Sequence, residues 1–78
     1  MKQLIKELEL GFITEQEFIY SVGISFNLKV AYPKGTHNEL ALQIAKEGKD
    51  ITKDRFKEIL DNHADKYNRE NLVEVKFS

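Results

Sequence analysis

The sequence contains no cysteine, no tryptophan and one proline in 78 residues. Without cysteine the chain can form neither a disulfide nor a thiolate metal site, which are common ways of stabilising small domains, and the redox compartment is left open. A chain of this length buries only about 60% of its unfolded surface, so a single core barely offsets chain entropy. We therefore expect stability to depend on efficient packing, within the chain or against a partner subunit.

The sequence also lacks an excess of charge and a long apolar run. Its formal net charge is −1, which is neither the basic excess of a nucleic-acid-binding protein nor the acidity of a DNA mimic. No segment approaches the roughly 20 apolar residues of a membrane span. Glu7 and Glu9 occupy what would be the apolar region of a signal peptide. These features predict a cytoplasmic protein with no membrane partner.

Four segments have the apolar spacing of amphipathic helices, and the composition, 41% hydrophobic and 32% charged, is typical of a folded domain. We predict helices at about residues 2–10, 15–22 and 37–47, and a fourth from the cap residue Thr52 to about residue 67. Gly residues at positions 11, 23 and 48 follow the first three helices, where a residue that ends a helix is expected.

Threonines precede three of these helices at positions suited to N-capping. Thr14 with Glu17 and Thr36 with Glu39 have the spacing of a capping box, in which hydroxyl and carboxylate each satisfy a free backbone N–H. Thr52 has no such partner, because Arg55 stands at the corresponding position. Each of these threonines therefore predicts where a helix begins.

The apolar period changes to 2 at residues 24–32, which predicts a strand that ends at Pro33. A second alternating stretch at residues 72–77 predicts a strand that pairs with the first. We expect an α+β fold with the order α-α-β-α-α-β, in which four short helices pack on a small antiparallel sheet. The expected single domain, 1–78, comprises a helical hairpin at 1–23, the strand 24–32, a second hairpin at 36–67 and the strand 72–77.

The pattern Ile-Thr-x-x-x-Phe occurs twice, at residues 13–18 and 51–56. In both copies the apolar residues flank the capping threonine as a hydrophobic staple, which fixes the angle at which the chain approaches the helix. The repeat therefore indicates a way of building a helix. It is compatible with an internal duplication and with independent use of the same capping chemistry.

Residues 4–22, LIKELELGFITEQEFIYSV, resemble the short helical hairpin of SHOCT-type segments. The resemblance covers about a quarter of the chain, and the Lys-Leu-Leu ending of that family is replaced by Ile19 to Val22. It implies an oligomerisation or interaction role, a bacterial or phage origin, and no catalytic residues. The matching residues are Leu4, Leu8, Gly11, Ile13, Thr14, Glu17 and Phe18.

No pattern in the sequence indicates catalysis, so we expect no enzymatic activity, cofactor or metal. It has neither a Gly-rich phosphate loop nor a G-x-S-x-G motif, and a chain this small leaves little room for a substrate pocket. The two imidazoles, His37 and His63, are far apart and lack clustered ligands. We place His37 in a loop beside a helix start and His63 on a half-buried flank of the core.

The preferred function is a small non-enzymatic interaction or regulatory module that binds another protein. An open edge of the predicted strand could pair with a partner or with a second copy in a homodimer. The alternative for the two tyrosines involved is that they border the core. The candidate contact residues are Tyr20, Tyr32, Pro33 and Lys34.

The second functional hypothesis is a helix-turn-helix regulator formed by residues 39–62, with the strand from Leu72 as a wing. The predicted fourth helix also carries Asp54, Glu58 and Asp61, which disfavour phosphate contact, so nucleic acid is the less favoured partner. The candidate DNA-binding residues are Lys53, Arg55, Lys57 and Asn62.

Overall fold

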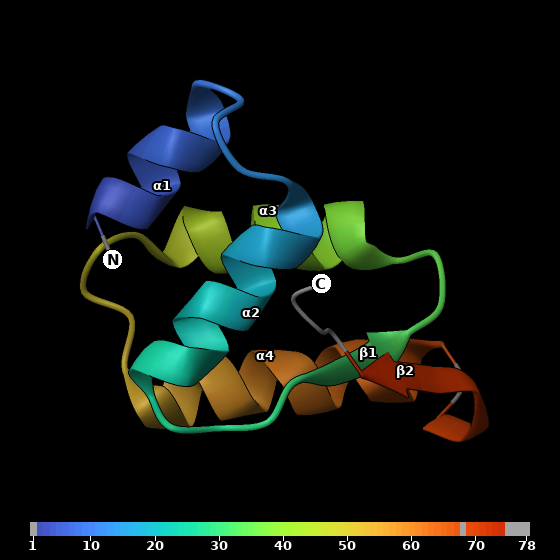
Figure 1. Ribbon diagram of the computed structural model, residues 1–78. Coiled ribbons are helices and arrows are strands. Elements are labelled where there is room, and N and C mark those ends of the chain that lie inside the picture. Colours follow the sequence, from blue (N-terminus) through green and yellow to red (C-terminus); the bar gives the residue numbers. More distant parts are fainter. Residues whose placement is uncertain (1, 68, 75–78) are drawn as a thin grey trace.

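The computed structural model describes residues 2–67 and 69–74 of the chain (Figure 1). Within these residues it has four α-helices, one 3-10 helix and a two-stranded antiparallel sheet in the order α-α-β-α-α-β, which confirms the expected small α+β fold. The elements are α1 (Lys2–Glu9), α2 (Glu15–Ser25), β1 (Ala31–Pro33), α3 (His37–Glu47), α4 (Lys53–Lys66), η1 (Arg69–Asn71) and β2 (Leu72–Glu74).

The helices surround a core that lies between α2, α3 and α4 (Figure 1). α2 packs on α3, and α3 packs on α4. α1, the first helix of the chain, packs against α2. The sheet lies at one end of the molecule, where β1 packs against α4. The small sheet therefore flanks the helices instead of forming a surface beneath all four of them.

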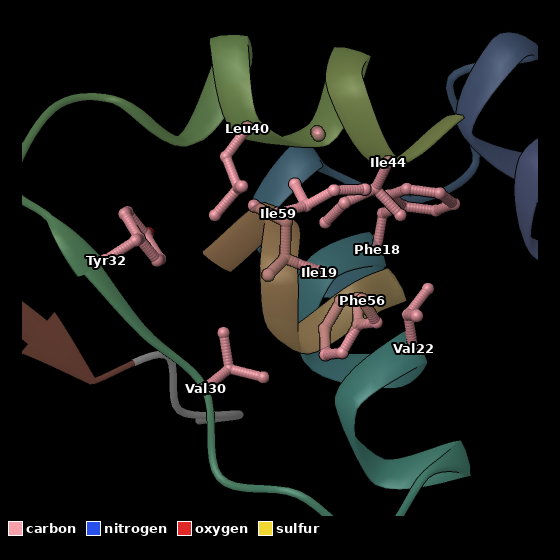
Figure 2. Close-up of a cluster of buried hydrophobic side chains, with 10 residues drawn as sticks. Phe18, Ile19, Val22, Val30, Tyr32, Leu40, Ile44, Phe56 and Ile59 are labelled. Carbon is pink, nitrogen blue, oxygen red and sulfur yellow. The ribbon is translucent and has the colours of Figure 1, made fainter. Parts of the chain in front are cut away.

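The core side chains converge from three helices and from the extended segment that leads into β1 (Figure 2). Partly buried apolar residues of α1, among them Leu4 and Leu8, pack against the outside of this cluster. The buried hydrophobic side chains of this cluster are Phe18, Ile19, Val22, Val30, Tyr32, Leu40, Ala41, Ile44, Phe56 and Ile59.

The strand predicted at residues 24–32 is much shorter in the structure. α2 continues to Ser25, and the helical chain is reversed at Asn27, whose φ is 57°. The Leu28 N–H then bonds the Gly23 carbonyl at 2.9 Å, so the returning chain is held against the end of α2. Only Ala31–Pro33 forms a strand. The alternating apolar residues reflect a helix end followed by an irregular segment that covers the core.

β1 and β2 pair antiparallel as expected, with Tyr32 opposite Val73 at the centre of the register. β2 begins at Leu72, where the second strand was predicted to start. The remainder of that prediction, residues 75–77, lies outside the described residues.

Two of the three predicted threonine caps are present in full. Thr14 and Glu17 form a reciprocal capping box, with N–H to oxygen distances of 2.9 and 3.1 Å, and Thr52 accepts from the Arg55 N–H at 3.1 Å. Thr36 makes no side-chain cap. Its hydroxyl instead donates to the Pro33 carbonyl at 2.6 Å, which corrects the second predicted capping box.

Candidate functional site

A groove of about 240 Å³ lies between α1, the start of α2 and α3. Its position follows from two local features. At the end of α1 the Phe12 N–H bonds the Glu7 carbonyl at 2.9 Å, and Gly11 has a φ of +78°, so the chain turns back toward α3. On α3 the small side chains of Ala41 and Ala45 leave the space unfilled. The lining residues are Leu8, Glu9, Glu15, Asn38, Ala41, Leu42 and Ala45.

One large apolar side chain is exposed on the wall of this groove, and two more are exposed in the turn between α1 and α2. Leu42, one of the lining residues, is 57% exposed. Leu10 and Phe12 are also exposed, Phe12 to 74%, and both lie in the turn that joins the lining residues Glu9 and Glu15. An exposed apolar side chain on a concave surface is typical of protein-binding sites.

The charged groups of the groove are all of one sign. Glu9 and Glu15 line it, and the described lining residues include no lysine, arginine or histidine. The segment Lys2–Ser25 that forms this side of the molecule contains two lysines and four glutamates. The groove therefore combines an apolar floor with acidic side chains from α1 and α2.

The lining residues provide two carboxylates and one amide beside aliphatic side chains. Pockets for small-molecule substrates have volumes of about 300 to 1,000 Å³, which is larger than this groove. Over the residues that the structure describes, no group of three or more His, Cys, Asp or Glu is placed to hold a metal ion.

The structure separates the four predicted partner-binding residues. Tyr32 is only 3% exposed and belongs to the core, where burial raises the pKa of its phenol and its ring meets the His37 ring edge-on at 6.3 Å. Pro33 is buried as well, and Tyr20 is half-buried against the core. Tyr32 and Pro33 therefore offer no surface to a partner, because β1 packs inward on α4, and Lys34 alone of the four is exposed.

The predicted DNA-binding residues lie on α4, and one of them is held by acids. The Arg55 Nε donates to Glu47 Oε1 at 2.7 Å, and its Nη1 contacts Glu58. The hydrogen bond with Glu47 is the main cause that raises the pKa of Arg55. Lys53, Lys57 and Asn62 are exposed. The guanidinium most suited to phosphate contact is thus neutralised within the protein.

His63 is more deeply buried than expected, at 1% exposure instead of half-buried. Its Nε2 lies 2.7 Å from the Thr36 hydroxyl oxygen. Because the one proton of that hydroxyl is donated to Pro33, Nε2 must carry a proton and act as the donor. Nδ1 is then the unprotonated nitrogen, and it has no hydrogen-bond partner in the described part of the chain. Burial is the main cause that lowers the pKa of His63.

Sequence reasoning missed the groove, although two signals were present. Leu42 falls outside the apolar stripe formed on the same helix by Leu40, Ala41 and Ile44, which marks it as a surface residue. Phe12 follows the helix-ending Gly11 at a position where an apolar side chain frequently contacts the last helical turn, but the residues available there, Lys6 and Glu7, are charged. Neither signal reveals the concavity that Leu42 lines.

Neither a family model, nor a curated protein, nor a solved structure matches this chain. Among the described helices, none combines the length and apolar character required to cross a membrane.

Proposed function

We propose that the protein is a small non-enzymatic interaction module that binds another protein through the groove between α1 and α3. The observation that carries this proposal is the exposure of Leu42 on the wall of a concave, mainly aliphatic surface. Burying an exposed Leu side chain contributes roughly 1.5 to 3 kcal/mol, so such a residue is a natural anchor for a partner.

The size of the groove supports a protein partner over a small molecule. At about 240 Å³ it can take one or two inserted side chains, whereas it is small for a substrate. Phe12 and Leu10 extend the apolar surface beyond the groove itself. A partner that contacts the groove and the adjoining turn would bury all three exposed side chains together.

The helix-turn-helix alternative has less support. The ion pairs of Arg55 with Glu47 and Glu58 occupy the side chain that would best contact phosphate. Regulatory action, a cytoplasmic location and a bacterial or phage origin stay predictions from the sequence.

An unbiased selection of peptide ligands tests the proposed function. The full chain is presented to a displayed library of peptides about 16 residues long, a length that permits helix formation in water. Selected peptides are then titrated into labelled protein, and the chemical-shift changes are mapped by NMR. We expect the changes to centre on Leu8, Leu42 and Ala45.

Two matched variants make this test specific. Leu42→Ser should weaken the selected peptides about tenfold. Ile24→Ser, on α2 and outside the groove, changes a side chain of nearly equal exposure, 56%, and should leave binding unchanged. Failure to enrich any peptide, or equal effects of the two variants, would contradict a docking groove. Titration with random duplex DNA at low salt provides the contrasting result, since shifts at Lys53 and Lys57 would support the alternative.

A further inference from the structure

We infer that the groove binds an amphipathic helix of a partner protein whose apolar anchors are flanked by lysine or arginine. This inference rests on the proposed function and specifies its ligand. It follows from the spacing of the apolar lining residues and from the sign of the charges beside them.

The spacing of the lining residues on α3 fits a helical ligand. They run from Asn38 to Ala45, which at 1.5 Å per residue spans about 10 Å, or two helical turns. Leu42 is exposed and Ala45 is half-buried, and they lie three positions apart, so accessible apolar side chains recur at an interval at which a second helix also presents residues, i and i+3. A partner helix can therefore place successive apolar side chains against Leu42 and Ala45, in the manner of other helix-in-groove complexes.

The charges beside the groove select a basic ligand. Glu9 is the last residue of α1 and Glu15 the first of α2, so the two carboxylates lie at either end of the turn that carries Leu10 and Phe12. With no base among the described lining residues, neither carboxylate is neutralised by the groove itself. Complementary charges at the rim of an interface increase association rates and specificity.

The same charges disfavour a second copy of this chain as the occupant. A two-fold pairing through this surface would bring Glu9 and Glu15 of each protomer toward those of the other, and like charges across an interface are unfavourable. In a head-to-tail pairing, a helix of one copy would occupy the groove of the next copy. α4 does not suit this role, because its apolar side packs in the core through Phe56 and Ile59.

The charge of the peptides selected from the unbiased library tests this inference. We expect enrichment of lysine and arginine at positions flanking apolar residues spaced by three or four. The affinity of those peptides should fall several-fold when the salt concentration rises from about 50 mM to about 500 mM, because exposed charges are then screened. Peptides with the same apolar positions but glutamate for lysine should bind at least tenfold more weakly.

The double variant Glu9→Gln/Glu15→Gln identifies the acids responsible. Its affinity for basic peptides should be about three- to tenfold lower, the range expected for two exposed ion pairs. The control Asp50→Asn/Glu74→Gln removes two exposed acids elsewhere and should leave affinity unchanged. Circular dichroism of each variant checks that the fold is retained.

The outcomes separate this inference from the proposed function. Neutral or acidic peptides that bind at Leu42 as tightly as basic ones would overturn the inference and leave the docking groove intact. Absence of any groove-binding peptide would overturn both. Concentration-dependent shifts of the groove residues in the protein alone would show that a second copy occupies the groove, and would likewise overturn the inference.

Discussion

At the scale of single residues, Gly23 has the least space around it. It lies within α2, and a Cβ atom added there would be 2.2 Å from Val30 Cγ2 and 3.3 Å from the Leu28 carbonyl oxygen. The chain that returns after α2 therefore passes directly over the glycine. Gly23 was predicted from the sequence to end the helix. In the structure it instead allows the returning chain to approach α2 closely.

Gly23→Ala should destabilise the protein by about 1 to 3 kcal/mol, the usual cost of overpacking a core. Helix propensity alone predicts the opposite sign, a gain of roughly 0.5 to 1 kcal/mol. Urea denaturation measures the free energy of unfolding. In a Val30→Ala background the clashing methyl group is absent, so the cost of Gly23→Ala should fall by at least half. Equal costs in both backgrounds would refute the contact.

His63 should make the stability depend on pH. Its pKa is lowered in the folded protein, chiefly by burial, while Glu39 opposes and Lys66 adds to this shift. The unfolded chain therefore binds the proton more tightly than the folded chain. Stability is fully present above about pH 6.5 and falls as the pH is lowered through that value, by at most about 1.4 kcal/mol per pH unit.

Denaturation curves between about pH 7.5 and pH 5.5 measure this dependence, in a range above the titration of most carboxylates. His63→Gln should remove most of the slope, whereas His37→Gln, which removes the other imidazole, should preserve it. An NMR titration of the His63 ring gives a direct check that needs no substitution. A midpoint at or above about 6.5 would contradict the lowered pKa.

At the scale of elements, Thr36 connects three parts of the fold. Its hydroxyl donates to Pro33 at the end of β1 and accepts from His63 on α4, while Thr36 itself precedes α3. One hydroxyl group thus satisfies polar groups from two other elements. This use explains why Thr36 does not cap its own helix.

Thr36→Val should cost about 1 to 3 kcal/mol of folding stability, since it leaves the buried His63 N–H without its partner and removes one of the two hydrogen bonds that Thr36 donates to the Pro33 carbonyl. Thr36→Ser keeps the hydroxyl and should cost less than about 1 kcal/mol. Thermal and urea denaturation of the two variants measure the difference. If valine and serine are equally tolerated, the hydroxyl does not contribute through these bonds.

The helices were predictable because their signals are local. Thr14 and Thr52 cap the next few residues of the same chain, so their roles can be read from spacing alone. Glu39 has the spacing of a capping residue, yet it contacts Lys66 and Tyr67, which lower its pKa. The choice between these partners depends on how α3 and α4 pack. The prediction of a long strand at residues 24–32 was wrong because it, too, depends on tertiary packing, which alone reveals the reversal at Asn27.

The candidate site was harder to predict than the fold. Tyr32 has the residue type expected at an interface, but its burial depends on the packing of β1 against α4. The groove joins residues from α1 and α3 that are more than 25 positions apart, and its volume depends on small side chains. The exposure of Leu42 could be inferred from its helical position, whereas the concavity beside it could not.

At the scale of the whole molecule, α3 is tied to α4 at both ends. Near the start of α3, Glu39 bonds Lys66 at 2.6 Å and also contacts Tyr67, and at its end Glu47 bonds Arg55 at 2.7 Å. The structure describes every residue of α1, and none of them is buried. Of the two helices beside the groove, α3 is thus fixed by side-chain bonds to α4, whereas α1 has no buried residue to anchor it.

Hydrogen exchange should resolve this difference. Amide protons in α1 should exchange at least about tenfold faster than those in the central turns of α2, α3 and α4, because local opening of α1 exposes little of the core. NMR-detected exchange at neutral pH measures each amide. Comparable protection in α1 and α2 would show that they open as one cooperative unit. Groove-binding peptides should slow exchange in α1 more than in α3.

The unequal anchoring of α1 and α3, which lie on either side of the groove, affects which ligands the groove would recognise. For the proposed helical ligand, α3 should hold its position because it is tied to α4 at both ends, whereas α1, none of whose residues is buried, should shift to fit side chains of different size. α3 would then set the spacing of the apolar anchors, and α1 would set how large they can be. Such an arrangement favours a family of related sequences as ligands over a single one, with affinity reduced by the entropy of fixing α1.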